Sequence, residues 1–200
     1  MSLYALKPGF QALLRPLVGT LARCGITANQ VTVAAAVVST ALGTFVAWRL
    51  PDAHAFGLIP LWLFARMACN AIDGMLAREC GQQSRLGAYL NELADVVSDV
   101  ALYLPFALLP PFSLLWTGLV IVLAVISELA GILGPMVGAS RRHDGPMGKS
   151  DRALAFGALG LWAGLAAPLP EWAMLVMPAL AGSLVVTIVN RVRGGLKEGR

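Results

Sequence analysis

One stretch of the sequence, residues 70–99, gathers acidic and amide side chains that could bind a metal ion or accept a proton. Residues three or four apart share one face of a helix. Two such faces result, one with Asn70, Asp73 and Ala77, the other with Gly87, Asn91, Asp95 and Asp99. Carboxylate and amide oxygens suit a hard cation such as Mg²⁺ or Mn²⁺. The stretch therefore predicts a divalent-metal site between two antiparallel helices.

The elements that must position these residues are membrane helices. The chain of 200 residues is 58% hydrophobic and only 13% charged. Soluble domains average about 45–50% apolar residues and about 25% charged residues. Runs without Asp, Glu, Lys or Arg, such as Cys24–Trp48 and Val100–Ser127, reach the roughly 20 residues that cross a bilayer core. Continuous apolar runs such as Leu114–Ile126 do not alternate, which excludes a transmembrane barrel.

We predict an all-α fold, a polytopic membrane bundle of six transmembrane helices preceded by an amphipathic interfacial helix over Leu3–Leu21. The six spans are Val31–Trp48, Phe56–Ala77, Leu86–Leu108, Leu114–Val137, Ala153–Leu169 and Trp172–Val192. The chain then divides into a cytoplasmic juxtamembrane segment (1–29), a transmembrane domain (30–193) and a cytoplasmic tail (194–200).

The distribution of basic residues predicts the orientation of these spans. Thirteen of the fifteen Lys and Arg residues fall in the N-terminal segment, the second and fourth connections and the tail. Cytoplasmic loops carry this excess in membrane proteins. Both termini and the candidate active site are therefore expected on the cytoplasmic side of a bacterial-type inner membrane. The net charge of +4 belongs to a face that meets anionic membrane lipid, and nucleic acid is not expected as a partner.

The candidate metal ligands also belong to a longer motif with fixed spacing. The chain reads Asn70-Ala-Ile-Asp73-Gly74-Met-Leu-Ala77-Arg78, then eight residues, then Gly87-Ala-Tyr-Leu-Asn91-Glu-Leu-Ala-Asp95. This resembles the signature of the CDP-alcohol phosphotransferases, Asp-x-x-Asp-Gly-x-x-Ala-Arg, eight residues, Gly-x-x-x-Asp-x-x-x-Asp. Six of the eight fixed positions match, and the six-span architecture is similar too.

The resemblance implies a membrane phosphotransferase of phospholipid synthesis. Such an enzyme moves a phosphatidyl group from CDP-diacylglycerol or a similar CDP-alcohol to a small polar acceptor alcohol, releases CMP and depends on a divalent metal. The implied metal ligands are Asn70, Asp73, Asn91 and Asp95. Asp95 is the implied catalytic residue, as general base or further ligand. The implied nucleotide-binding residues are Gly74, Ala77, Arg78, Gly87 and Asn29. The family also implies a homodimer.

Two positions depart from the family signature, because Asn70 and Asn91 stand where the family has its first and third aspartates. An amide oxygen ligates metal but brings no charge and cannot act as a base. Three outcomes follow: one metal instead of two, replacement carboxylates, or a non-catalytic relative that binds nucleotide-lipid or metal without turnover. The replacement candidates are Asp99, Glu92 and Glu128, with a solvated helix end as the plain alternative for the first two. A transporter would show repeat symmetry, which the sequence lacks.

The fourth connection between the predicted spans is basic and rich in glycine. Its cations are Arg141, Arg142, Lys149 and Arg152. They suit the phosphate of an acceptor or of a lipid, and they favour a phosphorylated acceptor such as glycerol 3-phosphate. The plain alternative is a loop that is basic only because it faces the cytoplasm.

Overall fold

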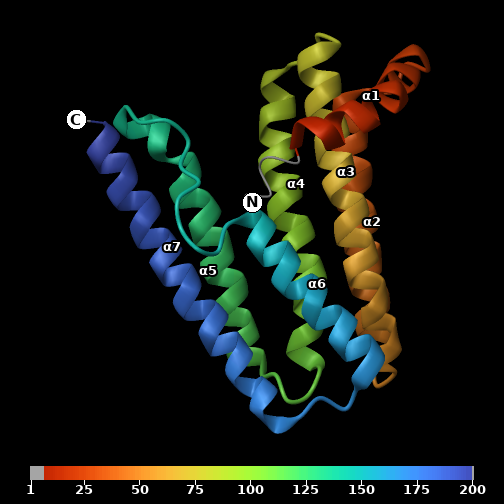
Figure 1. Ribbon diagram of the computed structural model, residues 1–200, viewed down its shortest axis with the longest axis vertical. Coiled ribbons are helices and arrows are strands. Elements are labelled where there is room, and N and C mark those ends of the chain that lie inside the picture. The colour runs from red at the N-terminus through yellow and green to blue at the C-terminus, as the bar shows by residue number, and fades with distance from the viewer. Residues whose placement is uncertain (1–6, 200) are drawn as a thin grey trace. The chain divides into compact units, whose positions relative to one another are not determined.

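A computed structural model describes residues 7–199, and these residues form helices and connections without a strand (Figure 1). The chain separates into two compact units. Unit 1 comprises Met1–Ala41 and Trp62–Ser98, and unit 2 comprises Leu42–Leu61 and Asp99–Arg200. The boundary crosses α2 (Ala28–Arg49), α3 (Leu58–Glu79) and α4 (Arg85–Tyr103).

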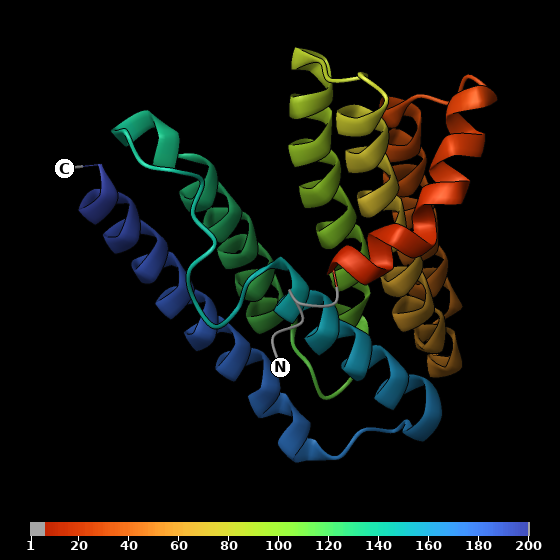
Figure 2. The ribbon, with the colours of Figure 1, turned by 45° about the horizontal axis from the view of Figure 1, so that its top comes forward.

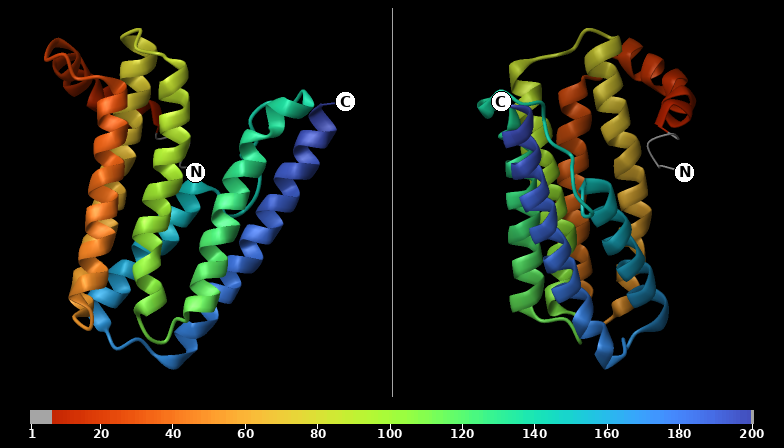
Figure 3. Two further views of the ribbon diagram at one scale, coloured as in Figure 1. Left: turned by 180° about the vertical axis from the view of Figure 1, so that it is seen from behind. Right: turned by 60° about the vertical axis from the view of Figure 1, so that its left-hand side comes forward.

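Unit 1 contains α1 (Lys7–Arg23) and the parts of α2, α3 and α4 that run side by side (Figures 1 and 3). Buried Val18 of α1 packs against Ile72, Met75 and Leu76 of α3. This apolar contact holds α1 across the C-terminal half of α3 (Figure 2).

Two of the helices that carry candidate site residues, α2 and α4, begin with side-chain caps. Before α2, the Thr27 hydroxyl accepts a hydrogen bond from the Gln30 main-chain N–H over 3.2 Å, and the Gln30 side chain accepts one from the Thr27 N–H over 2.9 Å. This reciprocal pair is a capping box. Before α4, the Ser84 hydroxyl accepts from the Gly87 N–H over 2.9 Å. The caps satisfy main-chain donors that the first helical turns leave unpaired.

Unit 2 is built on α5 (Leu114–Ile132) and α7 (Val176–Glu198), which run side by side in every view (Figures 1 to 3). The third long helix, α6 (Lys149–Ala166), packs against the short helix η2 (Ala53–Gly57). Glycines permit this close approach, because a Cβ added at Gly164 would lie 2.7 Å from the main-chain nitrogen of Gly57. Two short helices follow the ends of α4 and α5, namely η3 (Leu104–Leu108) and η4 (Gly134–Val137), and a third, η5 (Glu171–Leu175), leads into α7.

Four helices in the described part of the chain are long and apolar enough to cross a membrane. They are Ala28–Arg49, Ala53–Glu79, Leu114–Ile132 and Glu171–Glu198. Helices α4 and α6 also coincide with predicted spans, but they carry the charged residues of the candidate site. The structure thus supports a helical membrane protein, and the count of six spans stays a prediction.

The ends of the chain differ in part from the sequence-based expectation. The predicted amphipathic helix is helical from Lys7, and its first residues, 3–6, lie outside the described residues. Val18 of this helix faces α3, whereas Leu13 and Leu17 are exposed, so contact with a membrane surface stays a prediction. The predicted tail 194–200 continues α7 as far as Glu198, and Arg200 lies outside the described residues.

Candidate active site

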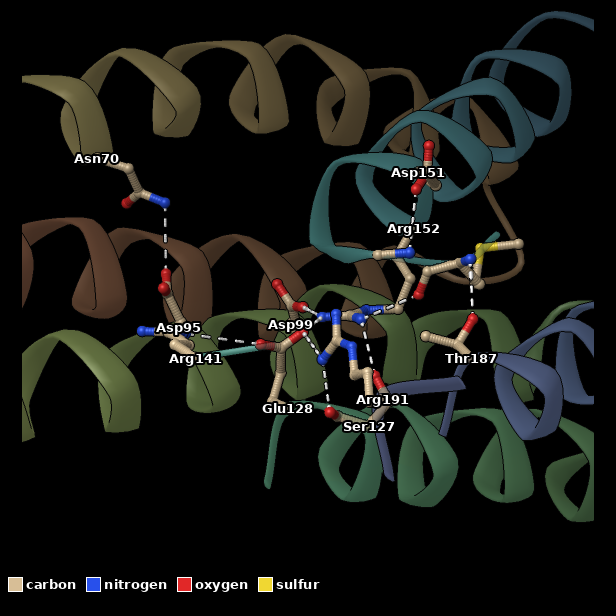
Figure 4. A network of polar contacts seen from close by, with 12 residues as sticks. Asn70, Asp95, Asp99, Ser127, Glu128, Arg141, Asp151, Arg152, Thr187 and Arg191 are labelled. Atoms are coloured by element: carbon tan, nitrogen blue, oxygen red, sulfur yellow. Dashed lines mark hydrogen bonds and ion pairs between the residues drawn. The ribbon is translucent and has the colours of Figure 1, made fainter. Parts of the chain in front are cut away.

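The first polar cluster lies in unit 1, where α3 and α4 face each other. Asn70 donates a hydrogen bond from Nδ2 to Oδ1 of Asp95 over 3.3 Å (Figure 4). Arg66, one turn earlier on α3, donates from Nη2 to the same oxygen over 3.1 Å and to the Asp95 main-chain oxygen over 3.0 Å. The side chains of Arg66 and Asp95 are only 5% and 16% exposed. The structure thus brings Asn70 and Asp95 together and adds a guanidinium to them.

Asp73 occupies the next turn of the same face of α3 and is 6% exposed. Its Oδ2 accepts a hydrogen bond of 2.7 Å from the Thr32 hydroxyl of α2. Asn91, one turn before Asp95 on α4, is half-buried. The buried Asp73 carboxylate needs a hydrogen-bond partner such as Thr32, because transfer of an unpaired charge from water is costly.

The predicted nucleotide-binding residues form two close pairs in unit 1. A Cβ added at Gly74 would lie 2.8 Å from an Arg78 guanidinium nitrogen, so this guanidinium lies directly against Gly74. A Cβ added at Gly87 would lie 2.8 Å from Oδ1 of Asn29, so the start of α4 and the start of α2 meet there. Ala77, by contrast, packs against the apolar cluster beneath α1.

The second polar cluster lies in unit 2 and centres on Arg152 (Figure 4). This side chain is 1% exposed and donates to Asp99 over 3.2 Å and to Glu128 over 2.8 Å. Arg191 lies 3.5 Å from Glu128, and Arg141 lies 3.9 Å from it. Asp99 and Glu128, predicted as replacement metal ligands, thus contact guanidinium groups.

The remaining cations of the basic connection have different surroundings. Arg142 donates to both carboxylate oxygens of Asp144, over 2.8 and 3.0 Å, and it also pairs with Glu198 of α7. These hydrogen bonds lower the pKa of Asp144. Lys149 is the first residue of α6. Burial lowers the pKa of His143, and the positive charges of Arg141 and Arg191 lower it further.

Three residues of the two clusters were not singled out as site residues in the sequence analysis. Arg66 has a recognisable signal, because it is a lone cation within an apolar span and lies four residues before Asn70. Arg191 was counted there only among the basic residues that predict the orientation. The contacts of Arg191 and Thr32 depend on which helices pack together, and helical spacing alone does not reveal this.

The donor set of unit 1 fits one hard cation in its chemistry. Asn70 and Asp95 meet across α3 and α4, buried Asp73 lies one turn beyond Asn70, and Asn91 lies one turn before Asp95. Carboxylate and amide oxygens of this kind are ligands of Mg²⁺ and Mn²⁺. In the described residues no group of three His, Cys, Asp or Glu side chains is placed to bind a metal. The site is therefore poorer in charge than one with a carboxylate at every ligand position.

The fold and this site define a helical membrane protein with an acid and amide cluster on two adjacent helices. Residues 25–189 match the CDP-alcohol phosphatidyltransferase family, and the chain belongs to that family. The membership confirms the resemblance found in the sequence and makes the chain a CDP-alcohol phosphatidyltransferase, an enzyme of phospholipid synthesis.

Two relatives span nearly the whole chain. The inner membrane protein YnbA of Escherichia coli is 43% identical over 196 residues, which cover 98% of this chain and 97% of that protein. The phosphatidylinositol phosphate synthase of Mycolicibacterium smegmatis is 30% identical over 196 residues, which cover 93% of this chain and 85% of that enzyme. The inner-membrane relative agrees with the apolar helices and supports an integral membrane protein.

Two solved structures share the fold. The phosphatidylinositol phosphate synthase PgsA1 of Mycobacterium tuberculosis with CDP-DAG bound has a TM-score of 0.73 and 22% identity, over 90% of this chain and 92% of that one. The same enzyme in complex with manganese and citrate has a TM-score of 0.72 and 22% identity, over 90% and 87%. At this identity the likeness establishes the fold alone.

Proposed function

We propose that the protein transfers a phosphatidyl group from CDP-diacylglycerol, or a similar CDP-alcohol, to a small polar acceptor alcohol and releases CMP. The observation that carries this proposal is the contact of Asn70 and Asp95 across α3 and α4, beside buried Asp73. Family membership and the CDP-DAG bound to the M. tuberculosis relative support the choice of donor.

A divalent cation, Mg²⁺ or Mn²⁺, completes this site in the proposal. Asn70, Asp73, Asn91 and Asp95 would hold it, because their oxygens are suitable ligands and lie on facing sides of two helices. When bound, the cation neutralises charge on the pyrophosphate of the donor. The manganese in the structure of the M. tuberculosis relative supports a divalent cation as the bound group.

The reaction needs a proton acceptor for the attacking hydroxyl. The hydroxyl oxygen forms a bond to the alcohol-linked phosphorus of the CDP-alcohol, and the bond from that phosphorus to the oxygen of CMP breaks. Asp95 accepts the hydroxyl proton or serves as a further cation ligand. Hydrogen bonds from Arg66 and Asn70 fix the orientation of its carboxylate, which favours proton transfer at a defined atom.

The nucleotide of the donor would lie along the starts of α2 and α4 and the end of α3. The absence of a side chain at Gly74 and Gly87 lets Arg78 and Asn29 lie directly against the helix backbone there. In this assignment Arg78 meets a phosphate and Asn29 accepts or donates a hydrogen bond. Ala77 supports the site through its packing beneath α1.

The acceptor is proposed to carry a phosphate. Three guanidinium groups, those of Arg141, Arg152 and Arg191, meet the two carboxylates of Asp99 and Glu128 in unit 2. These five side chains carry three positive and two negative charges, and Lys149 adds a cation at the start of α6. Arg142, in the same connection, pairs with Asp144 and Glu198. An excess of fixed positive charge in a partly buried site favours an anion. Asp99 and Glu128 hold Arg152 in this assignment.

The orientation and assembly in the membrane complete the proposal. We place the site and both chain termini on the cytoplasmic side, because thirteen of the fifteen Lys and Arg residues lie in the segments assigned to that side. The family resemblance further supports a homodimer. Cysteine labelling from one side of inverted vesicles would test the orientation.

Removal of divalent metal is expected to abolish the reaction. Purified protein in lipid vesicles that contain CDP-diacylglycerol should release CMP with Mg²⁺ or Mn²⁺, stop with EDTA, and resume when either metal is restored. The acceptor panel comprises glycerol 3-phosphate, inositol phosphate, serine, glycerol and lipid alcohols, and phosphorylated acceptors should give the faster rates. Absence of CMP with every acceptor, in protein shown to be folded, would contradict the proposed function.

Gly87→Ala is expected to weaken donor binding without loss of stability. The added methyl would lie 2.8 Å from Oδ1 of Asn29 and 3.0 Å from the Ser84 hydroxyl, so it would displace Asn29. The KM for the CDP-alcohol should rise about tenfold, the equivalent of one lost hydrogen bond. Alanine is favoured over glycine in a helix, so the melting temperature should not fall. Gly118→Ala is the matched control, because nothing lies within 4 Å of its added methyl.

A further inference from the structure

Arg66 is a buried cation inside the candidate active site of unit 1. It lies on α3 within a segment long and apolar enough to cross a membrane. Its position four residues before Asn70 places it on the face of α3 that carries Asn70 and Asp73. An arginine in such a segment is costly, and arginine keeps its charge in proteins. A plain apolar residue would fill the space at lower cost, so the charge itself needs an explanation.

The contacts of Arg66 direct this charge at one carboxylate. Its Nη2 lies 3.1 Å from Oδ1 of Asp95 and 3.0 Å from the Asp95 main-chain oxygen. Asn70 donates to the same Oδ1 over 3.3 Å. Two donors from α3 thus converge on a single oxygen of α4, and the positive charge of Arg66 lies within hydrogen-bond distance of a carboxylate that the proposed function assigns to the cation.

The charge count of the cluster distinguishes one bound cation from two. Asp73 and Asp95 contribute two negative charges, Arg66 contributes one positive charge, and the amides of Asn70 and Asn91 contribute none. One divalent cation brings the sum to +1, whereas two would bring it to +3. An excess of that size in a half-buried site is strongly unfavourable.

We propose that Arg66 takes the place of a second divalent cation beside Asp95, so that this site binds a single divalent cation. The inference rests on the proposed function, because it concerns the cation of that site. Arg66 is then a positioning residue, which supplies fixed charge and orients the Asp95 carboxylate. The amides Asn70 and Asn91 stand where the family has aspartates. They agree with this inference, because a site with one divalent cation and one guanidinium needs fewer carboxylates to balance its charge.

The first test counts bound Mn²⁺ in the whole protein in lipid nanodiscs. Equilibrium binding should give one Mn²⁺ per chain, and the electron paramagnetic resonance spectrum should show an isolated ion. Two Mn²⁺ per chain with exchange-coupled spins would overturn the inference and leave the proposed function in place, because two-metal sites hold their ions about 3.5–4 Å apart. Absence of Mn²⁺ binding would overturn both the inference and the metal site of the proposed function.

The second test separates charge from mere support of the fold. Arg66→Gln removes a positive charge beside the cation and should tighten Mn²⁺ binding by about tenfold or more. If Arg66 only supported the fold, the same substitution would displace Asp95 and weaken Mn²⁺ binding. Weaker binding would therefore overturn the inference. Arg66→Lys is the control, since it keeps the charge and should stay within about threefold of the parent affinity. If Arg66→Gln does not fold, the Mn²⁺ count of the parent protein still decides.

Asn70→Asp and Asn91→Asp extend the test in the opposite direction. Combined with Arg66→Gln, they give four carboxylates and no guanidinium, and this variant should bind two Mn²⁺ per chain with coupled spins. Retention of a single isolated Mn²⁺ in the folded triple variant would show that charge does not set the number of cations, and would overturn the inference.

Discussion

Asp95→Asn is expected to lower the rate of CMP release by about 10²–10⁴-fold, the usual loss when a positioned proton acceptor is removed. The amide keeps the size of the carboxylate but cannot accept a proton or carry charge. It also leaves the buried guanidinium of Arg66 without the ion pair that the structure shows at 3.1 Å. The loss should appear mainly in kcat and not in KM, because the substitution alters the reacting centre and leaves the nucleotide contacts unchanged.

The measurement compares initial rates of CMP release at saturating CDP-diacylglycerol and acceptor. Asp52→Asn is the matched control, since it makes the same chemical change at an exposed turn where Asp52 pairs with Arg49. Exposed pairs contribute about 0–1 kcal/mol, so this variant should keep the parent rate. A folded Asp95→Asn protein with a rate within about tenfold of the parent would show that Asp95 neither accepts the proton nor holds the cation.

The candidate site was predictable to the extent that single helices define it. Offsets of three and four place Asn70 with Asp73, and Asn91 with Asp95, whatever surrounds them. The short connection between α3 and α4 then brings the two faces into contact, as the hydrogen bond from Asn70 to Asp95 shows. Family membership supports the same stretch of chain, because the match covers residues 25–189.

The partners of these residues were not predictable in the same way. The hydrogen bond from Thr32 to Asp73 joins residues 41 positions apart, and Arg191 lies 3.5 Å from a carboxylate of α5, Glu128. Such contacts depend on which helix faces pack together, a choice set by apolar burial over whole helices and not by local spacing. For the same reason, an amphipathic α1 could be predicted but its packing of Val18 on α3 could not.

The role of Arg152 shows where reasoning from composition falls short. As one of four cations in a basic connection it indicates a phosphate ligand, yet the structure buries its side chain between two carboxylates. Arg152 is buried because of its position in the first turn of α6, where its side chain points inward. Lys149 is the first residue of the same helix. A basic connection can therefore supply both the structural centre of a network and its excess charge.

Arg152→Met is expected to destabilise the protein by about 3–5 kcal/mol, the cost of removing one partner from a buried ion pair. The side chain is 1% exposed and donates to Asp99 and Glu128 within 3.2 Å. Methionine fills much of the same volume, so the loss reports charge and not an empty space. Thermal or denaturant unfolding in detergent micelles measures the change, and Arg141→Met, 40% exposed and 3.9 Å from Glu128, should cost less than about 1 kcal/mol.

A second substitution distinguishes unbalanced charge from lost packing. If Arg152→Met is destabilising because Asp99 loses its counter-charge, then Asp99→Asn in the same chain should restore part of the stability, with a coupling energy of about 0.5–3 kcal/mol. Glu128 also loses its 2.8 Å ion pair with Arg152 and keeps Arg191 at 3.5 Å, and Asp99→Asn does not replace the lost pair, so recovery should be incomplete. Additive losses from the two substitutions would assign the stability of unit 2 to the packing of α5, α6 and α7, and would remove Arg152 from the centre of the network.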